Sequence, residues 1–110
     1  MKKENRVKKS EEFQRIIHEK HSTGSSCFVV YTSPRAQDHC RIGISVSKKL
    51  GNAVVRNRVK RQMRMILMEL VNNDTCQYDL IVIAKPEYVR NDYATNKNML
   101  EKQLKKGKII

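Results

Sequence analysis

The chain has 110 residues, of which 23 are Lys or Arg and 11 are Asp or Glu, so its formal net charge is +12. This length supports one domain, expected over 1–110, and its small core leaves little room for a deep enzyme pocket. No apolar run approaches the ~18 residues of a membrane-spanning helix, and three cysteines at irregular spacing, Cys27, Cys40 and Cys76, give no disulfide framework.

Hydrophobic periodicity and turn signals predict the elements that follow residues 1–9, which are expected to be a mobile basic arm. Ser10, Asn52 and Asp92 are expected to cap helices, because their side-chain oxygens can accept a hydrogen bond from the first turn. In chain order the pattern predicts a helix over 10–19, a turn or short edge strand over 21–26, strands over 27–32 and 41–47, a helix over 53–71, a strand over 78–84 and a helix over 93–106.

Two of these strands indicate how the sheet is buried. Ile42, Ile44 and Val46 alternate with small or polar residues, which predicts one buried face. Residues 78–84 are almost continuously apolar, which predicts a central strand buried on both faces. The order helix, strands, helix, strand, helix therefore predicts a small α+β fold, with one mixed sheet packed with helices.

Positive charge is concentrated in residues 48–64, which hold seven Lys or Arg and no acid. In the helix expected over 53–71, an apolar stripe leaves most of the basic side chains on the opposite face. Arg binds phosphate through paired hydrogen bonds and can stack on bases, and the N-terminus of a helix attracts anions. The predicted nucleic-acid contacts are Lys48, Lys49, Arg56, Asn57, Arg58, Lys60, Arg61 and Arg64.

Other interpretations of this charge are less favoured. A solvated helix face usually mixes signs, with Glu and Lys four residues apart, whereas this helix has no acid before Glu69. A DNA recognition helix is disfavoured because strands precede it in place of a second helix. Nucleic acid is thus favoured over an acidic protein or a membrane surface, and the basic N-terminus, which no apolar stretch follows, favours a cytoplasmic location.

The sequence offers no catalytic centre of its own. The acids are scattered, with no pair spaced for a two-metal nuclease or for acid/base catalysis. The three histidines and three cysteines have no zinc-binding spacing. We therefore expect no catalytic residue, no metal site and no small-molecule substrate in this chain.

The stretch GISVSKKLGNAVVRNRVKRQMR, residues 43–64, resembles the signature of the bacterial ribonuclease P protein component, with an RNR motif at 56–58. Three further segments, VKKSEEFQRII, CFVVYT and YDLIVIAKP, are similar to other parts of that family. The resemblance implies a small basic protein that assists a catalytic RNA in removing the 5′ leader from precursor tRNA. It implies that the RNA carries the catalysis, with Mg²⁺ held mainly by the RNA, and that the strand–helix–strand crossover is left-handed.

The resemblance also implies that the RNR helix faces the catalytic RNA and that a groove between the first helix and the sheet receives the single-stranded leader. Matched by motif, that groove is lined by Phe13, Ile17, Val29 and Tyr31. From the residues alone, core packing of Phe13 is the alternative, because large aromatic side chains are usually buried.

A second functional hypothesis is a general RNA-binding or ribosome-associated protein without a role in processing. A third, a stand-alone nuclease, lacks candidate acids.

Overall fold

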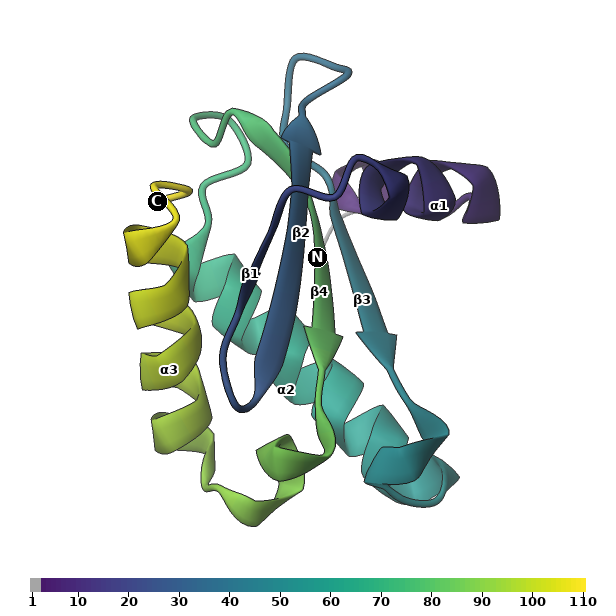
Figure 1. Ribbon diagram of the computed structural model, residues 1–110, viewed down its shortest axis with the longest axis vertical. Coiled ribbons are helices and arrows are strands. Elements are labelled where there is room, and N and C mark those ends of the chain that lie inside the picture. The colour runs from purple at the N-terminus through teal and green to yellow at the C-terminus, as the bar shows by residue number, and fades with distance from the viewer. Residues whose placement is uncertain (1–2) are drawn as a thin grey trace.

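The computed structural model describes residues 3–110, which form one four-stranded sheet with three α-helices (Figure 1). This is the α+β fold predicted above. The strands are β1 (Ser22–Gly24), β2 (Phe28–Pro34), β3 (Ile42–Val46) and β4 (Tyr78–Ala84); the helices are α1 (Ser10–His18), α2 (Ala53–Leu70) and α3 (Tyr93–Lys106), with short 3₁₀ turns η1 (Lys3–Asn5), η2 (Lys48–Leu50) and η3 (Pro86–Arg90).

The sheet is mixed, with strand order β1-β2-β4-β3. β4 is antiparallel to β2 and parallel to β3, so the chain needs a crossover between β3 and β4, and α2 supplies it. In Figure 1, β3 and β4 both point downward with β3 on the right, and α2 passes behind them, which makes the crossover left-handed. Nearly all such connections are right-handed, so this agrees with the resemblance and not with the general rule.

The two faces of the sheet pack against different helices. On one face Val30, Ile42 and Leu80 join a core cluster with buried residues of α2 and α3. On the other face Ile81 is fully buried with Ile16 of α1. Because successive residues of a strand alternate between faces, β4 is buried on both sides, as the continuous apolar run predicted.

The N-terminal segment contacts the edge strand β3. Val7 is buried, and its N–H donates to the carbonyl of Ile42 at 3.0 Å, while Arg6 forms a parallel bridge with Ile42. Arg6 and Val7 therefore pack against the sheet edge, because Val7 has an apolar cluster to enter. Mobility of the arm stays a prediction, and Met1 and Lys2 lie outside the described residues.

Two of the three expected helix caps form. The Asn52 side chain accepts from the Val55 N–H at 3.1 Å, and the Asp92 side chain accepts from the Thr95 N–H at 2.8 Å. The prediction for Ser10 is wrong, because the helix begins at Ser10 itself, one residue earlier than a cap at that position requires. Ser10 is the first helical residue, and Lys9 at the cap position makes no side-chain cap bond.

Candidate nucleic-acid interface

Helix α2 turns its apolar stripe toward the sheet and its basic face outward. Val59 and Met63 are buried in the core, which fixes the rotation of the helix. Asn57, Arg58 and Arg61 are then exposed, whereas the flanking side chains Arg56, Lys60 and Arg64 are half-buried. The apolar stripe therefore predicted the basic face, but part of each flanking side chain lies along the protein surface.

No carboxylate neutralises this face among residues 3–110. The ion pairs of the described chain involve other cations: Arg15, His39, Arg41, Arg90, Lys97 and Lys105. Even Glu69, the single acid of α2, pairs with Lys97 of α3. Uncompensated like charges destabilise a small domain, and a polyanion bound to this face would remove that repulsion.

The turn η2 brings two further lysines to the beginning of α2. Lys48 and Lys49 are exposed, and Ser47 accepts a hydrogen bond from the Lys49 N–H at 3.0 Å. Gly51 follows with a φ of 151°, a backbone conformation that favours glycine. The Asn52 cap accepts from the Val55 N–H, so that first-turn donor is already occupied by the protein.

The second predicted surface lies on the sheet face that α1 covers in part. Phe13, Ile17 and Tyr31 are half-buried around the cluster of Val7, Ile16 and Ile81. Val29 is two residues before Tyr31 in β2 and therefore lies on the same face of the sheet. Tyr31 pairs with Ile81 of β4, and Val29 pairs with Ile83. The four residues predicted to line a groove therefore share one face of the molecule.

Gly43 lets α1 approach this face closely. A Cβ atom on Gly43 would lie 2.6 Å from Phe13 Cζ and 2.6 Å from Ile81 Cδ1. The Phe13 ring thus rests over the backbone of β3, and it is both a packing residue and a half-exposed one. One side of the Phe13 ring packs against the protein, as the core alternative expects, and the rest of the ring stays accessible, as the groove interpretation requires.

A small cavity of about 110 Å³ connects the two predicted surfaces. Phe13 and Gly43 line it from the sheet side, and Arg64 lines it from α2. Arg6 and Val7 of the N-terminal segment complete it, and the sequence pattern did not predict their place there. The basic face of α2 and the aromatic face of the sheet are therefore adjacent.

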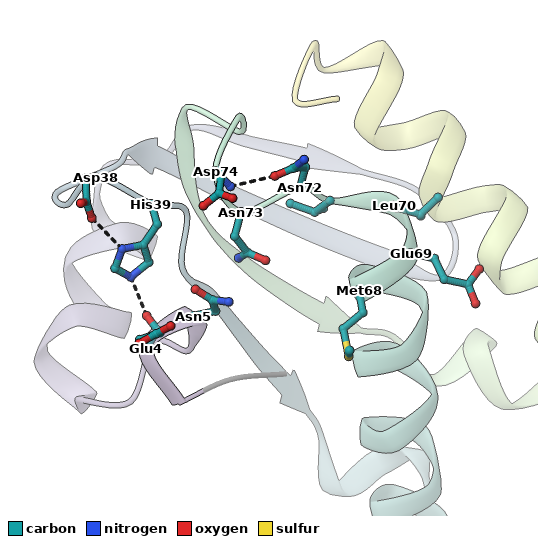
Figure 2. A pocket seen from close by; sticks show the side chains of 11 residues that line it. Glu4, Asn5, Asp38, His39, Met68, Glu69, Leu70, Asn72, Asn73 and Asp74 are labelled. Atoms are coloured by element: carbon teal, nitrogen blue, oxygen red, sulfur yellow. Dashed lines mark hydrogen bonds and ion pairs between the residues drawn. The ribbon is translucent and has the colours of Figure 1, made fainter.

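An acidic cavity of about 830 Å³ lies at the C-terminal end of α2 (Figure 2). Its lining includes Glu4, Asp38, Glu69 and Asp74. His39 also lines it, and its ring nitrogens contact Asp38 Oδ1 at 2.9 Å and the Glu4 carbonyl at 2.7 Å. Carboxylates repel phosphate, so this cavity marks the limit of the surface that suits nucleic acid.

Known proteins resemble this chain over nearly its whole length. The profile of the family Ribonuclease P matches residues 1–108. The chain belongs to the ribonuclease P protein family. Ribonuclease P protein components of Mycoplasma mycoides and Halalkalibacterium halodurans are 42% and 43% identical to it; these matches cover 98% and 100% of the chain, and 100% and 93% of the relatives. Members of the family are protein subunits of ribonuclease P, a tRNA-processing ribonucleoprotein nuclease.

Solved structures of the family have the same fold. A Staphylococcus aureus RNase P protein mutant with defective mRNA degradation activity is 42% identical, with a TM-score of 0.89 over 98% of this chain and 92% of that one. The Thermotoga maritima RNase P protein is 29% identical, with a TM-score of 0.72 over 88% of this chain and 96% of that one.

Residues 3–110 bring no three His, Cys, Asp or Glu side chains together in a way that could hold a metal ion. None of the helices that these residues form has the length and apolarity needed to cross a membrane.

Proposed function

We propose that this chain is the RNA-binding protein subunit of a cytoplasmic ribonuclease P, and that it assists the catalytic RNA in removing the 5′ leader from precursor tRNA. The observation that carries the proposal is the exposed, acid-free basic face of α2, which shares a small cavity with the aromatic face of the sheet. A phosphate backbone needs a row of cations, and a single strand needs apolar or aromatic platforms for its bases.

The basic face is assigned to the catalytic RNA. Side chains on a helix recur about one turn apart on the same face, a spacing that suits successive phosphates. The assigned contacts are Lys48, Lys49, Arg56, Asn57, Arg58, Lys60, Arg61 and Arg64.

The face lined by Phe13, Ile17, Val29 and Tyr31 is assigned to the leader of precursor tRNA. The half-exposed rings can stack on bases without reading sequence, because every base has an aromatic face. The small cavity beside Arg64 lets one RNA segment on the sheet and another on α2 lie next to each other.

Catalysis is assigned to the RNA, together with Mg²⁺ that the RNA holds. The chain's own residues bind and orient: α2 neutralises phosphates of the catalytic RNA, and the sheet face holds the leader beside it. Neutralising phosphates lowers the repulsion between two RNA molecules, so the protein should replace part of the Mg²⁺ that the RNA alone requires.

The test is cleavage of precursor tRNA by the catalytic RNA at low Mg²⁺, with and without this chain. We expect the leader to be released only when both are present. A general RNA-binding protein would bind the RNA without restoring cleavage, and that result would contradict the proposal. Cleavage by the protein alone, measured in a parallel reaction without the catalytic RNA, would contradict it in favour of a stand-alone nuclease.

A further inference from the structure

The outer face of α2 is not purely basic. Val54, Met65 and Met68 are 77%, 50% and 58% exposed, which makes them the most exposed large hydrophobic side chains among residues 3–110. The next two, Ile110 and Val89, are 40% and 39% exposed and lie outside α2. Exposed apolar side chains scattered singly are ordinary, but these three share one helix.

The three side chains also share one line with two arginines. Residues 54, 58, 61, 65 and 68 recur at spacings of four and three, so Val54, Arg58, Arg61, Met65 and Met68 fall within a sector of about 80° on a helical wheel. We call this line the outer stripe. It lies opposite the buried residues Val59 and Met63, so the packing of α2 that exposes the arginines also exposes the apolar groups.

Phosphate binding alone does not account for the outer stripe. A face that met only phosphates and water would favour polar side chains at 54, 65 and 68, as at its other exposed positions. Clustered exposed apolar groups indicate a contact surface. Methionine suits an irregular partner, because its side chain is flexible and its sulfur packs well against aromatic rings.

Charge decides between two possible occupants. In a symmetric pair of identical chains the same stripe would face itself, which would place Arg58 and Arg61 of one copy against those of the other. Among residues 3–110 no carboxylate forms an ion pair with Arg58 or Arg61, and the acids nearest the stripe lie at its Met68 end. The favoured occupant therefore has both negative charge and flat apolar surfaces, which is RNA with unpaired bases.

We propose that Val54 and Met65 pack against unpaired bases of the catalytic RNA while Arg58 and Arg61 bind the flanking phosphates. Met68 also lines the acidic cavity, so the contact ends before it. This inference rests on the proposed function, because it specifies the chemistry of the RNA that α2 binds. It gives the complex a component of affinity that does not depend on salt, beside the phosphate contacts that do.

The test measures the dissociation constant of the catalytic RNA across 50–200 mM salt for Met65→Gln and Val54→Thr, which keep side-chain size and replace apolar groups with polar ones. We expect each variant to bind about three- to tenfold more weakly at every salt concentration, which for Met65 is the range of a sulfur–aromatic contact and for Val54 that of a buried methyl group. The slope of log K against log salt should match the wild type. Arg61→Gln should instead reduce that slope by about one.

Inorganic polyphosphate, a polyanion without bases, separates the two components. We expect Met65→Gln to bind polyphosphate as the wild type does, and Arg61→Gln to bind it more weakly. Val89→Thr, on η3, is the matched control and should bind both polyanions as the wild type does. Circular dichroism and thermal unfolding of each variant confirm the fold, and Val54→Thr keeps the test valid if Met65→Gln fails to fold.

Three outcomes would overturn the inference. The first is unchanged RNA affinity in both Met65→Gln and Val54→Thr. The second is a loss of polyphosphate affinity in these variants as large as their loss of RNA affinity. The third is a wild type that sediments as a dimer and apolar variants that sediment as monomers, which would assign the stripe to self-association. All three leave the proposed function standing as long as the wild type binds the catalytic RNA in a salt-dependent way. Wild-type binding that is absent or independent of salt would contradict the proposed function itself.

Discussion

The Arg41 guanidinium lies against the Asp79 carboxylate, with 3.2 Å between Nη2 and Oδ2, although 38 residues separate them in the chain. Asp79 is fully buried, and its other oxygen accepts from the Arg41 backbone N–H at 3.0 Å. Glu12 of α1 also binds the Arg41 guanidinium. Burial opposes the charge on Arg41, but the hydrogen bonds that Arg41 donates to Asp79 and Glu12 outweigh it and raise the pKa of Arg41. The Arg41 side chain, directly before β3, therefore links α1 to β4 through its two ion pairs.

Replacing Asp79 should destabilise the fold strongly, because it leaves the buried Arg41 charge without its main partner. We expect Asp79→Ala to lower the free energy of unfolding by about 3–5 kcal/mol, measured by urea denaturation. Glu87→Ala removes an exposed partner of Arg90 and should change it by less than about 1 kcal/mol. Equal effects of the two substitutions would contradict the role given to Asp79.

The close approach of Phe13 to Gly43 predicts a second stability effect. Gly43→Ala places a Cβ atom 2.6 Å from Phe13 Cζ and 2.6 Å from Ile81 Cδ1, so α1 must move. We expect a loss of about 1–3 kcal/mol in the free energy of unfolding. Gly24→Ala is the matched control, because a Cβ there meets no atom within 4 Å. It should be neutral or slightly stabilising, and a neutral Gly43→Ala would refute the contact.

The groove assignment predicts a selective effect of Tyr31. We expect Tyr31→Ala to weaken binding of precursor tRNA to the holoenzyme by about 1–3 kcal/mol, the range of one base–aromatic contact. Mature tRNA has no leader, so its affinity is the internal control and should not change. If precursor and mature tRNA lose affinity equally, the leader does not lie on this face.

The basic face predicts a steep dependence of RNA binding on salt. If six or more phosphates are contacted, affinity for the catalytic RNA should fall by about 10³-fold or more between 50 and 200 mM salt. Arg61→Ala should weaken binding by about 1.5–3 kcal/mol, the range of a charge-assisted hydrogen bond. Arg90→Ala removes one exposed charge outside this face and should have little effect. A flat salt response would exclude phosphate contacts as the main source of affinity.

Local patterns predicted the elements and the buried face of α2 well. The caps at Asn52 and Asp92 depend on neighbours within a few residues, and the structure confirms them. Ile42, Ile44 and Val46 pack against one core cluster as their alternation predicted, but only Ile42 of the three is buried, and Gly43 on the other face is buried as well. The spacing of Val54 and Met65 was equally visible in the sequence. The charge pattern, however, predicts a role only for the basic residues of that face and none for Val54 or Met65.

Long-range relationships could not be predicted from such patterns. Arg41 alternates with apolar residues and therefore looked solvent-facing, but its partners come from α1 and β4. The packing of Val7 depends on a cluster that exists only after α1 and the sheet meet. The hand of the crossover contradicts the general rule, so only the family resemblance could indicate it.

His39 predicts a pH-dependent contact of the N-terminal segment. The Asp38 carboxylate and the Glu4 carbonyl can only accept, so both ring nitrogens must donate, and only the protonated ring does so. The hydrogen bond to Asp38, then that to Glu4, raises the pKa of His39. The negative charges of Asp38 and Glu4, which line the same cavity, favour the protonated ring as well (Figure 2).

Because the pKa of His39 is raised, its contribution is fully present below the ordinary pKa of histidine, about 6.5. It is lost as pH rises through the folded pKa. We expect the Val7 amide, which donates to Ile42, to lose protection from hydrogen exchange across that range, once the intrinsic effect of pH on exchange is divided out. In His39→Gln the protection should be independent of pH. A wild-type profile as flat as that of the variant would show that His39 does not hold residues 3–7 in place.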